Sequence, residues 1–600
     1  MRRTSSLVLL ALAGAACSGP LPPAETPGDL RDEARERGVV HRNRSGEATK
    51  ATVLEANGPG VALLDLGRDG DLDLVFSDGV GSLAELVAGP GADLVLYEND
   101  GAGRFRRLPG PGLAGWWTGL AVGDLDGDGD ADLVAGGFGG LAVLLQDERG
   151  TLVPRTDLLA GEAQRRLVPG APRAPGQPPL WVTSLALLDA DRDGVLDLYA
   201  GCYLELDPLR PPLRELGEGA LAVPCSWKGY EVFCGPHGMV PQADRFYRGL
   251  GDGTFRDQSA RALPGHVASY TLALAPFDLE GDGDLDLYVA NDSVANLLLV
   301  NDGQGTFTDV AYSAGVALSM DGRGEAGMGV AFGDIDRDGA LDLALTNFSG
   351  EPTALYFHRA RGFSNETFRF GLQRESAPLL SWGVHLEDFD GDGEFELFTA
   401  NGHVYPQADL ADTGTRYLQP DTLWRLSARG DERRLARVQP ADERSVLAPP
   451  SGSRGSAVGD LDGDGAPDLV IARLDAPAAL GINRFPRAQR LVVRCEGPRA
   501  SEGLAPDALR RSPTDATGAR VELRPAGADA RPIVRAVATG QGYQSASASE
   551  LYFGLGAERS YAELTIRWPS GRVERLGPGT AGRRIVVREG QGIVAEEALR

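Results

Sequence analysis

Asp124-Leu125-Asp126-Gly127-Asp128-Gly129-Asp130-Ala131-Asp132 is the stretch that decides the fold of this chain. Its carboxylates recur at alternate positions, and its glycines stand where the backbone must turn sharply. Ca²⁺ binds six to eight such oxygens at about 2.3–2.6 Å, whereas carboxylates about 4 Å apart repel by about 1 kcal/mol per pair even in water. We therefore predict a calcium loop, with ligands from the side chains of Asp124, Asp126, Asp128 and Asp132 and the carbonyl of Asp130.

Six further copies of this loop have first positions 54 to 89 residues apart, a period typical of small units that bury their apolar faces against one another. We number the acidic loops 1 to 7 in chain order, so that the copy above is loop 2, and number the positions within each loop 1 to 9. The other candidate calcium residues are Asp65, Asp69, Asp71 and Asp73 in loop 1; Asp189, Asp191, Asp193, Val195 and Asp197 in loop 3; Asp278, Glu280, Asp282, Asp284 and Asp286 in loop 4; Asp334, Asp336, Asp338, Ala340 and Asp342 in loop 5; Asp388, Asp390, Asp392, Glu394 and Glu396 in loop 6; and Asp460, Asp462, Asp464, Ala466 and Asp468 in loop 7.

The loops are not EF-hands, which need a bidentate glutamate at the twelfth position and a helix on each side. The flanks here are short apolar runs such as residues 120–122 and 133–135, which are typical of buried strands. Each loop is therefore predicted to join two strands of a small sheet. The twelfth positions are Phe76, Ala135, Ala200, Val289, Leu345, Thr399 and Ile471.

A second motif lies between the acidic loops, at residues 99–105, 251–255 and 301–307. Glycine and aspartate supply a turn there, and the phenylalanine that follows returns to the core. An acidic loop, a strand, a glycine turn and another strand make one four-stranded propeller blade. The predicted fold class is all-β: a seven-bladed β-propeller over residues 36–486, followed by a smaller domain.

Together these motifs resemble the FG-GAP or VCBS repeats of integrin alpha-chain propellers, over residues 36–485. The resemblance implies that the loops cluster on one face and that the chain holds up to seven Ca²⁺. Loop 1 departs from the pattern because Gly67 replaces the carboxylate at position 3, and Glu280 and Glu396 are longer substitutes. We expect these ions to brace the hairpins; regulation by calcium, or a ligand bridged by it, is the alternative.

Closing a propeller requires the two ends of the ring to meet. We expect residues 38–41 to supply a strand to the blade that contains Asp460. The third blade carries an insertion, residues 202–245, which accounts for the longest interval between loops.

Four cysteines remain after the first seventeen residues. Cys225 and Cys234 lie close together in the insertion, and we predict a disulfide between them, formed in an oxidising compartment. A zinc site built from these two cysteines and His237 is the alternative, although it lacks a fourth neighbouring ligand. For Cys202 and Cys495 two alternatives stay open: they pair with each other, or either one is free.

Residues 1–17 read as a secretion signal, with Arg2 and Arg3 before an apolar core that is too short to span a bilayer. Residues 14–17 resemble a bacterial lipobox, so Cys17 is the predicted lipidation site; cleavage by ordinary signal peptidase is the alternative. Residues 18–35 contain four prolines and are predicted to be a tether. The net charge of −26 disfavours nucleic acid as a partner.

After residue 487 the acidic repeats stop. The segments at residues 515–523, 540–547, 551–556 and 564–571 resemble, in this order, the ASPIC/UnbV domain over residues 487–590, with a tail at 591–600. Alternating apolar residues such as Leu564 and Ile566 predict a small β-sandwich. The whole chain thus resembles the CRTAC1-like proteins, a resemblance that implies no agreed biochemical activity.

Two further motifs are better explained without a function. His403, between a glycine and an aromatic residue, is predicted to be a turn histidine satisfied by backbone hydrogen bonds; a catalytic role is the alternative. Residues 429–431 spell Arg-Gly-Asp, an adhesion tripeptide, within a charged run where chance explains it.

We expect a non-enzymatic, exported scaffold that binds a protein or a glycan and touches a membrane only through a lipid anchor. Loops on a rigid scaffold are where binding usually occurs, and we expect the insertion and the C-terminal domain to enlarge one face. The alternative is a calcium-assisted polysaccharide lyase or hydrolase, since the fold alone does not decide function. No nucleophile–base pair is evident in the sequence.

Overall fold

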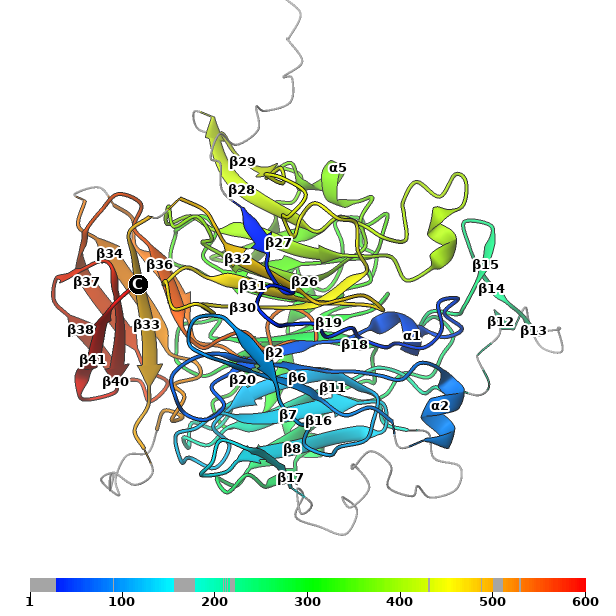
Figure 1. Cartoon of the computed structure of the whole chain (residues 1–600), viewed down its shortest axis with the longest axis horizontal. Helices are drawn as coiled ribbons and strands as arrows, with labels where there is room; N and C mark the ends of the chain where they lie inside the picture. The colour runs from blue at the N-terminus through cyan, green and yellow to red at the C-terminus, as the bar shows by residue number, and fades with distance from the viewer. Residues whose placement is uncertain are drawn as a thin grey trace, which may run out of the picture.

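The computed structural model describes residues 29–89, 91–155, 179–208, 210, 212, 214–215, 222–429, 432–486, 488–499, 511–527 and 530–600. Within these residues, seven four-stranded antiparallel sheets precede the C-terminal domain. Their innermost strands contact one another in the order β2, β6, β10, β18, β22, β26 and β30, and β30 contacts β2 again. The sheets therefore close into a ring, which is the predicted seven-bladed propeller. Figure 1 shows it from the side, with the C-terminal domain at the left and the hairpins of the insertion at the right.

Each blade is numbered with its acidic loop. Blades 1 to 3 contain β2 (Val61–Leu64), β3 (Asp73–Phe76), β4 (Val95–Asn99) and β5 (Phe105–Arg107); β6 (Trp117–Gly123), β7 (Asp132–Gly137), β8 (Gly140–Gln146) and β9 (Leu152–Pro154); and β10 (Val182–Leu188), β11 (Asp197–Cys202), β16 (Arg245–Gly249) and β17 (Phe255–Asp257). Blades 4 and 5 contain β18 (Thr271–Phe277), β19 (Asp286–Asn291), β20 (Leu297–Asn301) and β21 (Phe307–Asp309); and β22 (Val330–Gly333), β23 (Asp342–Leu345), β24 (Ala354–Arg359) and β25 (Gly362–Asn365). Blades 6 and 7 contain β26 (Ser381–Glu387), β27 (Glu396–Asn401), β28 (Thr422–Arg429) and β29 (Glu432–Arg437); and β30 (Ser453–Gly459), β31 (Asp468–Arg473), β32 (Ala479–Asn483) and β1 (Leu30–Asp32).

The local sequence explains this arrangement. Every residue of β10 is buried, as expected for an inner strand covered on both faces, and its last four residues, 185–188, are all apolar. Phe105, Phe255 and Phe307 are buried after their glycine turns, which confirms the prediction for the second motif. Short helices occupy connections between strands: α1 (Val53–Asn57), α2 (Leu83–Ala88), α3 (Ser259–Ala262), α4 (Ala311–Ala314), α5 (Leu372–Ser376) and the 3-10 helix η2 (Pro406–Asp409).

The start of the chain closes the ring, but not with the predicted residues. β1 pairs antiparallel with β32 as the outermost strand of blade 7. It lies within the segment predicted to be a tether, whereas residues 38–41 form no strand. Leu-Arg-Asp is too short to show an alternating pattern, and of its three residues only Leu30 is buried.

The insertion follows β11 and contains two hairpins, β12 (Arg214–Glu215) with β13 (Ala222–Val223), and β14 (Cys225–Trp227) with β15 (Tyr230–Val232). It joins the second and third strands of blade 3, whereas the acidic loops join the first and second strands. The insertion therefore lies on the face of the propeller opposite the loops.

The C-terminal domain has two sheets around one core, as predicted for a sandwich. Residues predicted to be a tail contribute β41, because the chain runs back antiparallel along β40. One sheet contains β33 (Arg490–Glu496), β36 (Leu551–Gly554), β40 (Arg583–Arg588) and β41 (Gly592–Ala598). The other contains β34 (Arg520–Pro525), β35 (Ile533–Ala536), β37 (Ser560–Arg567), β38 (Val573–Leu576) and β39 (Gly579–Thr580).

Residues 537–549, between β35 and β36, enter the centre of the propeller; we call them the plug segment. Gly542 exchanges two main-chain hydrogen bonds with Val330, of 2.7 and 3.1 Å. The carbonyls of Gln544 and Ala546 accept the N–H groups of Leu120 and Leu63, at 3.1 and 3.0 Å. Inner strands expose main-chain groups toward the propeller axis, and such groups need partners when they are buried. The plug segment supplies those partners, so the two domains form one unit.

Candidate metal centres

Each acidic loop is a tight turn held by its own carboxylates. In loop 2, Asp124 accepts the N–H groups of Gly127 and Gly129 at 2.8 and 2.9 Å. Asp132, at position 9, accepts the N–H of Leu125 at 2.9 Å and that of Gln146, on the third strand, at 2.8 Å. The carboxylates at positions 1 and 9 thus fix the loop to its blade, a structural role that the metal-ligand pattern alone did not predict.

Five of the seven loops bring three carboxylates together within 4.8 Å. Loops 1 and 4 form no such triad within the described residues. Loop 1 has Gly67 at position 3, and loop 4 has the longer Glu280 there. The triads are Asp124, Asp126 and Asp132 in loop 2; Asp189, Asp191 and Asp193 in loop 3; Asp334, Asp336 and Asp342 in loop 5; Asp388, Asp390 and Glu396 in loop 6; and Asp460, Asp462 and Asp464 in loop 7.

The position-3 carboxylates fit a bound cation. In loops 3, 5 and 7 one oxygen of Asp191, Asp336 and Asp462 contacts an arginine, at 2.7, 2.6 and 3.0 Å. The other oxygen of each is buried without a hydrogen-bond partner. Burying an unpaired carboxylate oxygen is costly, and metal ligands are characteristically oriented by a second layer of hydrogen bonds. The arginines Arg248, Arg359 and Arg37 provide that layer.

Burial raises the pKa values of the carboxylates at positions 1 and 9 of loops 2 and 5. The pKa of Asp342 is raised to about 8, first by burial and then by the charge of Asp336 and Asp334. Asp132 follows the same pattern, with a pKa of about 8, and Asp124 has a pKa of about 7. A cation within the cluster would favour the charged forms of these carboxylates.

Arginines at position 4 of loops 1, 3 and 5 each contact the next loop around the ring. The sequence alone did not predict these contacts. Arg68, Arg192 and Arg337, in loops 1, 3 and 5, have φ of 59°, 60° and 59°. In the next loop Arg68 contacts Asp130, at position 7, and also Asp128, at 2.8 Å. Arg192 and Arg337 contact the position-7 residues Asp284 and Glu394, at 2.8 and 3.3 Å. The left-handed backbone costs a non-glycine residue about 1–2 kcal/mol. Arginine at position 4 of loops 1, 3 and 5 alternates with glycine at position 4 of loops 2, 4 and 6. This alternation is the sequence signal that could have revealed these contacts.

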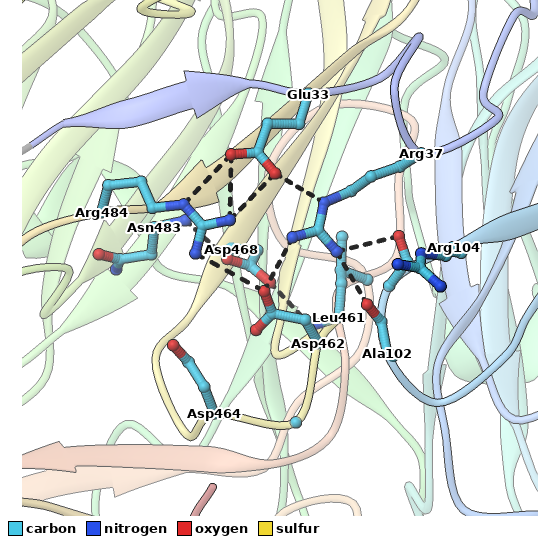
Figure 2. A network of polar contacts seen from close by, with 12 residues as sticks. Glu33, Arg37, Ala102, Arg104, Leu461, Asp462, Asp464, Asp468, Asn483 and Arg484 are labelled. Atoms are coloured by element: carbon cyan, nitrogen blue, oxygen red, sulfur yellow. Dashed lines mark hydrogen bonds and ion pairs between the residues drawn. The ribbon is translucent and has the colours of Figure 1, made fainter.

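Loop 7 is held by residues from both ends of the ring (Figure 2). Arg37 donates to Glu33 at 2.9 Å and to the carbonyls of Ala102 and Gly103, in blade 1, at 3.0 Å each. Arg484 donates to both oxygens of Glu33 at 3.0 Å. The network therefore joins the first residues of the propeller, its last blade and blade 1.

The C-terminal domain covers the loop face. Arg584 contacts Asp460 at 2.7 Å, and Arg490 donates to the carbonyl of Phe389 at 2.6 Å. Because the insertion lies on the opposite face, the expectation that both enlarge one face is wrong. The length of the insertion can be recognised in the sequence. The face of the propeller against which the distant C-terminal domain packs cannot.

The structure contains the predicted disulfide between Cys225 and Cys234. Both sulfurs are used by it, so the alternative zinc site with His237 is not supported. Cys202 and Cys495 are buried and free, and do not pair with each other. Burial raises the pKa of the Cys495 thiol to about 12.

His403 is the turn histidine that the sequence predicts. It is fully buried, and its Nδ1 accepts the N–H of Tyr405 at 3.0 Å. Nε2 therefore carries the proton and donates to Ser349 Oγ at 2.9 Å, a contact between distant residues that the sequence did not reveal. Burial lowers the pKa of His403 to about 3. A histidine that donates to a serine cannot remove its proton, so this pair is not a nucleophile and base.

Several predictions lie outside the described residues: the signal at 1–17 with Cys17, most of the tether, and the glycine and aspartate of the Arg-Gly-Asp motif. Among the described residues, none of the helices combines the length and apolar character needed to cross a membrane.

Two protein-family models match the chain. The one described as ASPIC and UnbV matches residues 509–594, and the one described as an FG-GAP-like repeat matches residues 82–135, 231–289 and 278–345. The chain combines FG-GAP-like repeats with an ASPIC/UnbV domain. This confirms the combination predicted from its motifs.

The chain is similar to cartilage acidic protein 1 from three vertebrates. The human protein is 26% identical over 513 residues, which cover 76% of this chain and 69% of the relative. The mouse protein is 28% identical, and the match covers 56% of this chain and 47% of the mouse protein. The Xenopus tropicalis protein is 29% identical, and the match covers 48% of this chain and 40% of that protein. The chain thus spans about half the length of the mouse relative that it matches.

Solved structures that match this chain include an Agrocybe aegerita lectin that recognises non-reducing terminal N-acetylglucosamine. The identity is 16% and the TM-score 0.38, and the match covers 71% of this chain and 93% of the lectin. The extracellular domain of the hybrid two-component system BT3049 of B. thetaiotaomicron is 9% identical with a TM-score of 0.37. This match covers 92% of this chain and 57% of that domain. TM-scores below 0.5 establish neither a shared ligand nor a shared function.

Proposed function

We propose that this protein is an exported, calcium-stabilised β-propeller scaffold that binds a protein or glycan ligand at the cell surface. The observation that carries the proposal is the set of buried, unpartnered carboxylate oxygens at position 3 of loops 3, 5 and 7. The FG-GAP-like repeats and the similarity to cartilage acidic protein 1 support the scaffold. A rigid ring of seven blades suits this role, because binding usually occurs on loops held by such a frame.

Loops 2, 3, 5, 6 and 7 are the proposed calcium sites, since each gathers three carboxylates. Calcium supplies positive charge, which offsets the repulsion among these groups. The residues of the chain do the positioning: position 1 holds the turn, and an arginine fixes one oxygen of position 3 in loops 3, 5 and 7. In loops 2, 4 and 6 the arginine of the preceding loop contacts the side chain at position 7, and the main-chain carbonyl there is the proposed ligand.

Attachment to a membrane through a lipid on Cys17 is part of the proposal, and secretion without a lipid is its alternative. Either route suits the disulfide in the insertion, which needs an oxidising compartment. A net charge of −26 argues against nucleic acid as a partner. Mass spectrometry of the mature N-terminal peptide tests the anchor: a diacylglyceryl group on Cys17 supports it, and an unmodified N-terminus identifies secretion.

Metal analysis of the purified full chain tests the calcium sites. We expect about five Ca²⁺ per chain after dialysis against micromolar calcium, about four for Asp336→Asn, and about five for the matched variant Asp69→Asn in loop 1, which has no triad. A metal-free protein, or equal loss in both variants, would contradict the assignment. Measurable turnover of acidic polysaccharides by the calcium-loaded chain would instead favour the enzyme.

A further inference from the structure

A cavity of about 860 Å³ lies beneath the insertion, on the face opposite the acidic loops. Trp382, at the start of β26, and Asp292, just after β19, mark its position at the ends of the strands that lie away from the loops. Small-molecule sites typically have volumes of about 300–1,000 Å³. The cavity therefore has room for a ligand, and neither the calcium loops nor the plug segment lines it.

Aromatic side chains form one wall of this cavity. Tyr405 packs against Trp227 and Phe233, with ring centroids 5.7 and 4.7 Å apart, and against Phe348 at 6.3 Å. The disulfide Cys225–Cys234 holds the hairpin that carries Trp227 and leads to Phe233. Faces of such rings attract cations. The chain already uses one in this way, because the Nζ of Lys228 lies 5.0 Å from the centroid of the Trp227 ring.

Two carboxylates line the same cavity, and among the described residues neither forms an ion pair with a lysine or an arginine. Asp292 is 7% exposed and accepts hydrogen bonds from Tyr203 at 2.5 Å and from Ser293 at 2.8 Å, both neutral donors. Glu351 accepts the N–H of Ala326 at 2.9 Å. Among the described residues that line the cavity none is a lysine or an arginine, and His237 is the basic side chain whose charge would favour the ionised form of Asp292.

A third group is an unpaired hydrogen-bond donor. Asn57 lines the cavity and is 1% exposed, and its side-chain nitrogen has no hydrogen-bond partner. A buried amide donor without a partner is costly, and an oxygen atom of a ligand would satisfy it. Burial raises the pKa values of Asp292 and Glu351, and for Asp292 this effect outweighs the hydrogen bonds and the charge of His237, which lower it.

We propose that this cavity binds an organic cation, a primary ammonium or guanidinium group on a body that also carries an acceptor oxygen. The positive group lies between the aromatic wall and the carboxylates of Asp292 and Glu351, and the oxygen accepts from Asn57. A lysine or arginine side chain of a partner protein and a free amino sugar share this chemistry. The inference rests on the proposed scaffold function, but it does not involve the calcium loops.

Isothermal titration calorimetry on the full, calcium-saturated chain tests the proposal. The probes are Nα-acetyl-lysine amide against Nα-acetyl-norleucine amide, which lacks only the ammonium group, and glucosamine against glucose. We expect at least one cationic probe to bind about tenfold or more tightly than its neutral counterpart. Tighter binding of the lysine probe identifies a protein side chain, and tighter binding of glucosamine identifies a sugar.

Glu351→Gln should weaken binding of the cationic probe about tenfold or more. The side-chain oxygen of the glutamine can still accept the N–H of Ala326. Glu231→Gln is the matched control, an exposed acid of the insertion that does not line the cavity. Equal binding of charged and neutral probes, no binding of any probe, or equal effects of the two variants would overturn the proposal. Because these measurements use calcium-saturated protein, their failure would leave the metal count untouched, and failure of the metal count would leave the cavity untouched.

Discussion

Nη2 of Arg37 lies 3.0 Å from Oδ2 of Asp462, which joins the first turn of the propeller to the acidic loop of its last blade. The side chains of both residues are little exposed, at 12% and 13%. The same guanidinium group also bonds to the turn between β4 and β5 of blade 1. One side chain thus reinforces the closure of the ring at the place where β1 completes blade 7.

Arg37→Gln should therefore destabilise the protein. Removing one partner of a largely buried ion pair costs about 3–5 kcal/mol, although residual exposure lowers this to about 2 kcal/mol here. Urea unfolding followed by tryptophan fluorescence measures the change. Arg35→Gln is the control, since Arg35 is exposed on the same turn. If both variants lost the same stability, the contact with Asp462 would not contribute to closure.

Calcium should stabilise the folded chain. Binding to the native state alone adds about 2.7 kcal/mol per site when the free ion is at one hundred times its dissociation constant. Thermal melts in millimolar Ca²⁺, in EGTA and in Mg²⁺ should give the highest midpoint with Ca²⁺, because the triads provide flexible oxygen clusters that Mg²⁺ uses less readily. Equal midpoints in Ca²⁺ and EGTA, with no metal retained, would contradict the calcium sites.

The acidic loops could be predicted because their chemistry is local: carboxylates at fixed spacing and the glycine turns that accompany them lie within nine residues. The blade count and the disulfide Cys225–Cys234 followed from the same short-range evidence. β1 could not be located in this way, since three residues carry no period and Leu30 is buried only by blade 7.

Contacts between distant residues were equally hidden. Nothing in the order Gly540-Gln541-Gly542-Tyr543 reveals that this turn pairs with the inner strands of several blades. Main-chain groups of the propeller that lack partners on the inner strands determine where it lies. The hydrogen bond between His403 and Ser349 depends likewise on two blades meeting.

The pH dependence of stability can be tested at Glu325. Burial, followed by the charges of Glu351 and Asp321, raises its pKa to about 7. The folded state thus holds this proton more tightly than the unfolded chain, whose glutamate has an ordinary pKa of 4.5. Its contribution to the free energy of unfolding is complete below pH 4.5 and is lost as the pH rises to about 7.

Glu325→Gln should therefore flatten the pH dependence by on the order of 1 kcal/mol between pH 4.5 and 7, after allowance for partial exposure. Urea midpoints of both proteins in saturating Ca²⁺ give the difference. Glu148→Gln, at an exposed turn, should leave the slope unchanged. Parallel curves for wild type and Glu325→Gln would show that Glu325 does not titrate in this window.

Tyr543→Ala should destabilise both domains together. Tyr543 is fully buried, its ring centroid lies 4.8 Å from that of Trp382, and its hydroxyl donates to the carbonyl of Asn57 at 3.1 Å. Truncating a buried aromatic residue costs about 3–5 kcal/mol, and here the loss falls within the propeller although the residue belongs to the C-terminal domain. Differential scanning calorimetry should show one transition at a lower temperature, while Tyr312→Ala, at an exposed position, leaves it in place. Two separated transitions in the wild type, of which only one responds to Tyr543→Ala, would show that the plug segment does not couple the domains.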